Sequence, residues 1–387
     1  MEPRVETVHS QPSWIIENDD VRIALTVTGG HMAPVTFFRA SASPIQPYHV
    51  SPWHSEGIRG LEPVLGPLRG DFFCLPFGGQ SVVKGVTYPT HGAPATAPWK
   101  AVGIEQGSGR TRATFTLSPT APRGTVTKTL TLVQGHTAVY IQHLLEGFDA
   151  RVPLGHHATL AGGDVADALL ISSSPVRFGM VAPRPAVAFE TDGEYSALRP
   201  GAVFRSLEKV PTVWKDMPFD SCASFPRRKG FCDIIQLVNK PSNGPAWVAA
   251  VNPAGGWLWY ALKDSSILPS TVFWMESRGR HGSPWNGRNC CIGLEDVCTC
   301  FAGGLPASTK PNELTRQGVA TSVRLSPGKP LAVNYIQGVA RIPKGFGRVR
   351  EAQFGNGTAT FIAENGKKVN AAVDTDFLRT GEVGSAG

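Results

Sequence analysis

The feature that most constrains this chain is a succession of short segments in which apolar and polar residues alternate. In residues 21–28, valine, isoleucine and leucine alternate with arginine, alanine and threonine. In residues 124–132, valine and leucine share one face, and threonine and lysine share the other. A period of two residues is typical of a strand with one buried face. No window keeps apolar residues at i, i+3, i+4 and i+7 for three turns, so no amphipathic helix is predicted.

Turn-forming residues separate these segments, with 43 glycines and 32 prolines among 387 residues. Residues 40–70 are rich in proline, glycine and serine, and we expect a long surface loop there. Consecutive strands without crossover helices predict an all-β fold, a large antiparallel β-sandwich. Short helical turns are expected near residues 310–316. Further strands are expected at residues 113–117, 138–146, 168–173, 186–190, 233–238, 246–252, 257–262, 271–276, 290–301, 319–325 and 332–336.

The C-terminal part of the chain has the pattern of a meander. Residues 358–362 and 369–373 flank Asn365-Gly366, and Asn-Gly is the strongest short hairpin signal. We find no internal repeat and no interdomain linker. We therefore expect one β-sandwich domain over residues 1–345, with residues 346–387 forming C-terminal strands and a tail packed on the same domain. The last ten residues are expected to fray.

Composition and charge narrow the function classes. Hydrophobic residues make up 41% of the chain and charged residues 17%, which indicates a globular protein. The formal net charge is +7, but no run of five lysines or arginines occurs, so neither nucleic acid nor a membrane is expected as a partner. The N-terminus has no apolar h-region and no window of eighteen apolar residues occurs, so we expect no signal peptide and no membrane span.

The cysteines indicate a reducing compartment. Their number is seven, and four of them lie at positions 290, 291, 298 and 300. A secreted disulfide framework would favour an even number, so we predict reduced thiols in a cytoplasmic protein. The C-C-x6-C-x-C spacing lacks the C-x2-C pairs of common zinc sites, and alternation with Val297 and Thr299 suits buried strand residues. We therefore expect no metal, and no cofactor.

Two histidines and one carboxylate stand out as a candidate acid/base set. His91 precedes a glycine on a proline-rich loop, His157 ends a double histidine after Gly155, and Glu295 follows Gly293 by two residues. Histidine titrates near neutral pH, and catalytic side chains concentrate on loops that a rigid scaffold carries.

The order of these motifs resembles the galactose-mutarotase-like superfamily, the aldose 1-epimerases and their relatives. The resemblance spans roughly residues 14 to 335, and its specificity lies in the order of short motifs. An arginine before a segment ending Pro-x-Phe-Gly resembles the hexose-6-phosphate epimerase branch. The motifs that carry the resemblance are Gly29-Gly30 after an apolar strand, Arg69 before Pro76-Phe77-Gly78, His91-Gly92 with Trp99 beyond, Gly155-His156-His157, Trp274 at a strand end, and Gly293-Leu294-Glu295.

The chain also departs from the family pattern. Family members often place proline and an aromatic residue after the second histidine, where this chain has Ala158, Thr159 and Leu160. The asparagine-rich stretch of the classical galactose enzymes is missing before His91. The resemblance therefore implies the superfamily rather than galactose as the substrate. The superfamily also contains sugar-binding domains of lyases and hydrolases, so the fold alone does not settle activity.

Anomer interconversion needs a base for the anomeric hydroxyl and an acid for the ring oxygen. The resemblance implies Glu295 as the base and His157 as the acid, with His91 bonded to a sugar oxygen. Apolar Leu294 and Val297 would bury Glu295 and raise its pKa. Asp296, on the other face of the strand, is expected to face solvent.

The substrate would be held by a second set of residues. Arg69 could hydrogen-bond to vicinal hydroxyls or to a phosphate, and tryptophans could pack on the C–H face of a sugar. His156 should point away from His157, where a core position is the simpler interpretation. The loop around His281 carries arginines that would suit an anionic sugar. The candidate substrate-binding residues are Arg69, Trp99, His156, Trp274 and Trp285.

Three functions remain open at this point. The favoured one is an aldose 1-epimerase-like isomerase acting on a small sugar or sugar phosphate, as a monomer or a homodimer. The second is a non-catalytic carbohydrate-binding protein that uses the same cleft. The third is a polysaccharide lyase or hydrolase related by fold, although such enzymes usually add a helical domain and none is predicted here.

Overall fold

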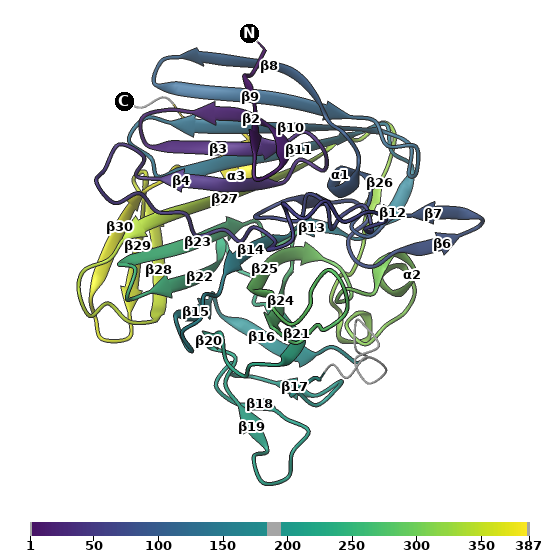
Figure 1. The fold of residues 1–387 in the computed structure, drawn as a ribbon, viewed down its shortest axis with the longest axis vertical. Helices are drawn as coiled ribbons and strands as arrows, with labels where there is room; N and C mark the ends of the chain where they lie inside the picture. The colour runs from purple at the N-terminus through teal and green to yellow at the C-terminus, as the bar shows by residue number, and fades with distance from the viewer. Residues whose placement is uncertain (1, 184–194, 385–387) are drawn as a thin grey trace.

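The computed structural model describes residues 2–183 and 195–384, and its regular structure is almost entirely β (Figure 1). The strands of both large sheets pair antiparallel with their neighbours. In β9 (Arg110–Leu117), partly exposed and buried residues alternate without interruption, as the period of two predicts. The antiparallel β-sandwich predicted from the sequence is therefore confirmed.

The larger sheet has nine strands. Its spatial order is β20-β15-β22-β23-β27-β11-β10-β9-β8. The runs β8 to β11 and β22 to β23 are consecutive in sequence, and β27 joins these two runs in the middle of the sheet from late in the chain. The bounds are β8 Lys100–Gly107, β9 Arg110–Leu117, β10 Thr125–Val133, β11 Ala138–Glu146, β15 Leu169–Ser173, β20 Ser224–Phe225, β22 Ala246–Asn252, β23 Trp257–Lys263 and β27 Leu331–Arg341.

The second large sheet has eight strands. Its order is β17-β16-β21-β24-β25-β13-β5, and β14 continues from β13 along the same edge of β25. β25 lies in the middle and is buried along its whole length. The bounds are β5 Phe73–Cys74, β13 Leu154–His156, β14 Ala158–Ala161, β16 Val176–Val181, β17 Val203–Phe204, β21 Phe231–Asn239, β24 Ser270–Ser277 and β25 Cys290–Cys298.

Smaller elements surround the two large sheets. An N-terminal four-stranded sheet packs Trp14 against Phe115 of β9, with ring centroids 4.7 Å apart. The remaining strands are β1 Val5–Val8, β2 Gln11–Glu17, β3 Val21–Thr26, β4 Met32–Phe37, β6 Ser81–Val83, β7 Val86–Tyr88, β12 Ala150–Val152, β18 Val210–Pro211, β19 Phe219–Asp220 and β26 Val323–Leu325. The helical turns are α1 Ala93–Thr96, α2 Gly304–Thr309, η1 Thr315–Gln317 and α3 Phe377–Thr380.

The main core lies between the two large sheets. Phe73 of β5 stacks on His143 of β11 at 4.0 Å, and His156 of β13 stacks on Tyr335 of β27 at 4.1 Å. Burial of these aromatic faces is the main driving force that holds the sheets together. Both faces of the eight-stranded sheet are covered in the region of β25, because loops pack on its outer face.

The C-terminal meander is present and packs on the outer face of the nine-stranded sheet. It consists of β28 (Val349–Gly355), β29 (Thr358–Ala363) and β30 (Lys368–Ala372). Phe361 is fully buried in a cluster with Trp247 and Tyr260 of the large sheet. Leu378 and Val383 are buried, so the predicted fraying is wrong for residues 378–384, and residues 385–387 lie outside the described residues.

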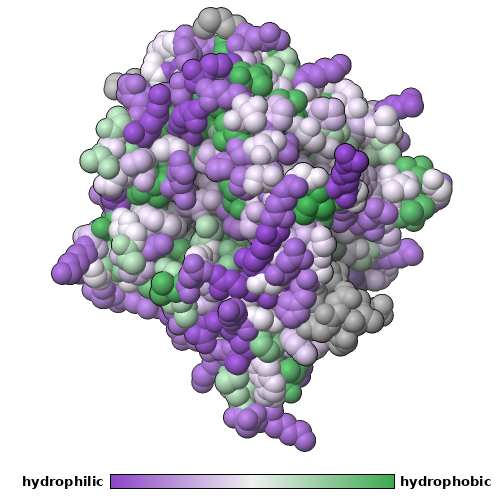
Figure 2. All heavy atoms as spheres, in the orientation of Figure 1, coloured by the Kyte–Doolittle hydropathy of each residue, from purple (hydrophilic) through white to green (hydrophobic). Residues whose placement is uncertain are grey.

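Most predicted strands are confirmed, and the differences are local. The expected strand at 319–325 is only β26, and helical turns flank the expected stretch at 310–316 as α2 and η1. The expected strand at 186–190 lies outside the described residues. Figure 2 shows apolar side chains at the tip of the projecting β6–β7 hairpin, where Val82 is 63% exposed.

All seven cysteines are free and buried, as small strand residues were expected to be. Asp296 faces away from Glu295, as predicted, but it is fully buried rather than exposed. Its carboxylate lies 2.6 Å from Lys263 Nζ and accepts hydrogen bonds from Thr271 Oγ1 at 2.6 Å and Tyr335 Oη at 2.8 Å. The expectation of solvent was wrong because the nine-stranded sheet covers this face of β25.

Candidate active site

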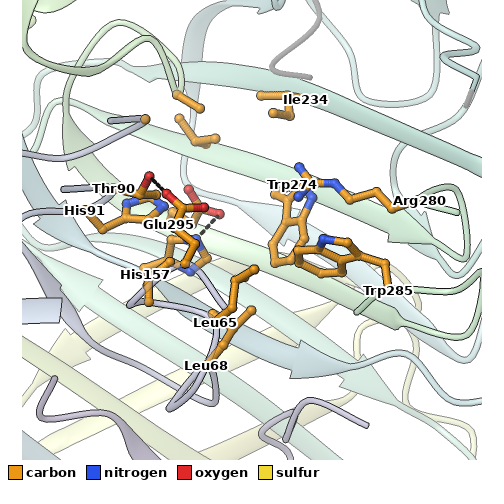
Figure 3. A pocket seen from close by; sticks show the side chains of 15 residues that line it. Leu65, Leu68, Thr90, His91, His157, Ile234, Trp274, Arg280, Trp285 and Glu295 are labelled. Atoms are coloured by element: carbon orange, nitrogen blue, oxygen red, sulfur yellow. Dashed lines mark hydrogen bonds and ion pairs between the residues drawn. The ribbon is translucent and has the colours of Figure 1, made fainter. Parts of the chain in front are cut away.

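A pocket of about 300 Å³ opens on the face of the eight-stranded sheet that points away from the nine-stranded sheet. Strands form its floor through Ile234, Val272, Trp274 and Glu295, and loops form its walls (Figure 3). Its size matches the lower end of small-molecule sites, which span about 300–1,000 Å³. The structure brings His91, His157 and Glu295 together here, although they are distant in sequence.

Glu295 projects from β25 into the pocket and is only 2% exposed. Residues two apart in a strand share a face, so Gly293 lies beside it. A Cβ at Gly293 would stand 2.3 Å from Glu295 Oε1, so the glycine leaves the space that the carboxyl group occupies. Burial raises the pKa of Glu295 well above its usual value, because desolvation disfavours the charged form.

His157 directly follows β13 and turns its ring into the pocket. The ring stacks on Phe72 at 4.5 Å, and Nδ1 lies 3.1 Å from Thr159 Oγ1. Nε2 lies 3.2 Å from Glu295 Oε1. Glu295 Oε1 is buried and has no hydrogen-bond partner among the described residues. Burial, and then the neighbouring His91, lower the pKa of His157 well below its usual value.

Glu295 and His157 together form a dyad that is placed to share one titratable proton. The raised pKa of Glu295 favours the protonated carboxyl group, and the lowered pKa of His157 favours the neutral imidazole. Moving that proton across the 3.2 Å gap gives the charged form of the pair with the same proton count. One member can therefore donate a proton while the other accepts one, which is the requirement of general acid/base chemistry.

His91 reaches the pocket from a left-handed backbone conformation, with φ of 60°. Its amide donates to Gly78 O at 2.8 Å, and its carbonyl accepts from Leu75 N at 3.2 Å. A Cβ on Gly92 would lie 2.0 Å from Leu75 O, so the His-Gly pair is needed for this close backbone approach. The same pair was visible in the sequence, but the reason for it was not.

The hydrogen bonds of His91 also fix its tautomer. Gly78 N donates to His91 Nδ1 at 3.3 Å, so the single proton of the neutral ring lies on Nε2. Burial lowers the pKa of His91 to about 3, with Arg280 adding to the effect. His91 is therefore a neutral hydrogen-bond donor over the physiological pH range.

Aromatic rings and an arginine form the wall opposite the dyad. Trp274 of β24 and Trp285 of the following loop are both less than a tenth exposed, and their rings meet edge to face at 5.8 Å. The Arg280 guanidinium lies 4.6 Å from the Trp285 ring and 5.4 Å from the Trp274 ring. Apolar ring faces of this kind pack well on the C–H face of a sugar.

Three of the predicted substrate-binding residues do not line the pocket. Arg69 is 1% exposed, and its Nε, Nη1 and Nη2 atoms donate to the backbone carbonyls of Pro67, Val8 and His9 away from the pocket. Trp99 is buried and donates to Pro94 O. His156 points into the sandwich, where its Nδ1 lies 3.0 Å from Asp71 Oδ2. The alternation with His157 predicted the inward position of His156, whereas the sequence did not reveal which face Arg69 and Trp99 occupy.

The pocket also contains residues that the sequence did not single out. Glu62 lines the wall near His91 and accepts a hydrogen bond from Thr90 Oγ1. Glu62 belongs to the expected surface loop. A hydrogen bond from Arg288 Nη2 to Glu56 Oε2, at 2.8 Å, holds that loop near the pocket. Arg280 had been noted only as one of several loop arginines. A loop without periodicity gives no signal for such contacts.

Two further observations concern the described residues only. In residues 2–183 and 195–384, no three His, Cys, Asp or Glu side chains are grouped so that they could hold a metal ion. No helix in the same ranges is long and apolar enough to cross a membrane.

No model of a known protein family and no curated protein sequence matches this chain. Several solved structures are similar to it. A galactose mutarotase-like protein from Clostridium acetobutylicum superposes with a TM-score of 0.58 at 10% identity, over 88% of this chain and 99% of its own. A Klebsiella pneumoniae protein provisionally named an aldose 1-epimerase gives 0.58 at 14% identity, over 87% of this chain and 82% of its own.

A third neighbour, from Salmonella typhimurium and provisionally named a mutarotase, gives a TM-score of 0.56 at 12% identity, over 88% of this chain and 94% of its own. At such low identity these likenesses show the fold and not the activity. The chain has the galactose mutarotase-like fold, and the resemblance inferred from its motifs is confirmed at that level.

Proposed function

We propose that this protein is a sugar-ring isomerase that interconverts the anomers of an aldose by acid/base catalysis. The observation that carries the proposal is the buried Glu295–His157 pair, with Oε1 and Nε2 3.2 Å apart at the floor of a sugar-sized pocket. A pair that shares one proton suits a reaction in which one proton leaves the sugar and another joins it. The fold of the neighbours supports the same reaction class.

The reaction needs no oxidant and no cofactor. The member of the dyad without a proton removes the proton from the anomeric hydroxyl, and the protonated member donates to the ring oxygen. The bond between C1 and the ring oxygen breaks, which gives the open-chain aldehyde. After rotation about the C1–C2 bond, the ring closes on the other face of the carbonyl and the two groups exchange roles. The two reacting oxygens share one carbon, which suits two groups 3.2 Å apart.

Following the resemblance, we assign Glu295 as the base and His157 as the acid in the first half, which they become once the shared proton has moved from Glu295 Oε1 to His157 Nε2. His91 donates from Nε2 to a sugar oxygen, and Trp274 and Trp285 cover an apolar face of the ring. These contacts would position the sugar so that both reacting oxygens lie within reach of the dyad. We further propose a cytoplasmic protein, because all seven thiols are free.

Anomer exchange by NMR tests the proposal. A panel of free and phosphorylated aldoses would be followed at equilibrium with the wild type and with His157→Asn, which removes a dyad member. We expect exchange above the spontaneous rate, and a loss of about 10²–10⁴-fold in the variant. The control is His9→Asn, since His9 is exposed with φ of 45°, a conformation that asparagine tolerates.

Two results would count against an isomerase. Full exchange activity in His157→Asn would remove the dyad from the mechanism. Sugar binding by the wild type without exchange of any sugar on the panel would favour a carbohydrate-binding protein that uses the same pocket.

A further inference from the structure

The wall opposite Glu295 presents hydrogen-bond donors without partners. Arg280 lines the pocket, and the only ion pair of its guanidinium among the described residues is Nε with Glu276 Oε2, at 3.4 Å. No hydrogen bond of its side chain is found in this part of the chain. Trp274 Nε1 is also buried there without a partner in the described ranges. Figure 3 shows the Arg280 head group close to Trp274 and across the pocket from Glu295.

This donor group is held in place by buried contacts. Glu276 is fully buried, and its Oε1 accepts from the amides of Gly279 at 2.7 Å and Arg280 at 3.2 Å. The loop also packs closely on the neighbouring strand at Gly279, where a Cβ would lie 2.4 Å from the backbone of Phe231. The guanidinium of Arg280 also packs against the rings of Trp274 and Trp285. A donor that is fixed before the ligand arrives loses little entropy on binding.

The two ends of the pocket have opposite character. Glu295 lies on the side of His91 (Figure 3), as does Glu62 through its hydrogen bond with Thr90, whereas the Arg280 side offers N–H groups. A hydroxyl group needs both a donor and an acceptor to be fully satisfied, whereas a carboxylate or phosphate accepts only. An anionic group therefore fits the Arg280 end, which offers a positive charge and N–H donors, better than the end where Glu295 and Glu62 lie.

The separation of the two ends fits a single sugar ring. In the pairing of β24 with β25, Val272 lies opposite Glu295 and Trp274 lies opposite Gly293. Trp274 and Glu295 are thus diagonal neighbours, and such Cβ atoms lie about 7–8 Å apart or somewhat less. A pyranose with its anomeric carbon at the dyad would place a substituent on the far side of the ring at Arg280.

We propose that the pocket selects aldoses that carry an anionic substituent, a carboxylate or a phosphate, whose oxygens accept hydrogen bonds from Arg280 and Trp274 Nε1. This rests on the proposed function in that the same pocket holds the sugar ring over the dyad. It assigns the anion to Arg280 and not to Arg69, which the backbone carbonyls occupy.

Calorimetric titration and anomer exchange on matched sugars test this subsite. The ligands are a neutral aldohexose, its uronic acid and its 6-phosphate, with inorganic phosphate and acetate as bare anions. We expect the wild type to bind at least one of the two anionic sugars about ten times more tightly than the neutral one, as a charge-assisted contact predicts. The uronic acid and phosphate arms tell which anion the site takes.

Three variants distinguish a loss of the anion subsite from a general disruption of the pocket. Arg280→Gln should weaken binding of the preferred anionic sugar by about 10- to 100-fold and that of the neutral sugar by no more than a few-fold. Trp274→Phe keeps an aromatic face and removes the N–H, so the anionic sugar should lose more affinity than the neutral one. Arg278→Gln removes the same charge two residues away, where the side chain pairs with Asp164 outside the pocket, and should change nothing.

The outcomes also separate this inference from the proposed function. Exchange of all three sugars with equal affinity would overturn the anion subsite and leave the isomerase standing. Arg280-dependent binding of an anionic sugar without exchange would support the subsite and overturn the isomerase. An equal loss for neutral and anionic sugars in Arg280→Gln would show a packing role only, and binding of bare anions alone would also overturn the selection of anionic sugars.

Discussion

Replacing Glu295 with glutamine should abolish activity and at the same time stabilise the protein at high pH. The substitution keeps the shape of a side chain that is 2% exposed, but it removes the proton that the dyad exchanges. Turnover should fall by at least about a hundredfold, the lower limit for general acid/base catalysis. Sugar affinity should stay within a few-fold, because the pocket walls are unchanged.

The stability effect follows from the raised pKa of Glu295. An unfolded glutamate titrates near 4.5, whereas burial holds the folded carboxyl protonated to much higher pH. Between the two pKa values the folded state binds one more proton than the unfolded state, so the free energy of unfolding falls by about 1.4 kcal/mol per pH unit. Glutamine has no such proton. From pH 6 to pH 8 the variant should therefore gain up to about 3 kcal/mol relative to the wild type.

Urea unfolding at pH 6, 7 and 8, followed by tryptophan fluorescence, would measure this difference, and NMR exchange would measure the activity. Glu105→Gln is the control, because Glu105 is exposed on β8 and loses the same charge. A stability difference that stays constant over this range would show that Glu295 is ionised in the folded protein. Full activity in Glu295→Gln would reject its role as the base.

Three further expectations follow from the same geometry. Gly293→Ala should displace the Glu295 carboxyl, since the new Cβ would lie 2.3 Å from Oε1, and should lower turnover in exchange assays while Gly107→Ala, with open space around its Cα, does not. Arg69→Met leaves three carbonyls without donors and should lower the free energy of unfolding in urea by about 3 kcal/mol or more, while the folded protein binds sugar unchanged. The turnover rate should fall at low pH, where His157 also becomes protonated and the dyad has no base, and at high pH, where Glu295 loses its proton and the dyad has no acid. A turnover rate that stays constant to both pH extremes would exclude the dyad.

Much of the fold could be predicted because the alternation of apolar and polar residues with a period of two is visible in the sequence. The alternation in β9 and β10, the absence of helical periodicity and the Asn365-Gly366 turn all lead to an antiparallel sandwich with a C-terminal meander. The same parity placed Glu295 and Asp296 on opposite faces of β25. It could not tell that both faces are buried, because β25 is covered by the second sheet on one side and by loops on the other.

The site was predictable where a residue belongs to a strand or a glycine motif, and not where long loops meet. His91 and His157 were found through their neighbouring glycines, which the close backbone approaches require. Arg69 was misplaced because its partners are backbone carbonyls of the N-terminal hairpin, which no side-chain pattern reveals. The contact of Trp53 with Trp285 at 4.7 Å, which closes the loop over the pocket, joins residues with no shared period.

The register of β25 connects the core to the chemistry. A slip of one residue would turn Asp296 into the pocket and Glu295 into the sandwich, because successive side chains face opposite ways. The slip would also separate Asp296 from Lys263, which is fully buried and lies 2.6 Å away, and an unpaired buried ammonium is strongly unfavourable. Gly155 adds a steric limit, since it packs so closely on β25 that a Cβ there would lie 2.5 Å from Asp296 O. The ion pair on the inner face thus disfavours every register except the one that presents Glu295 to His157.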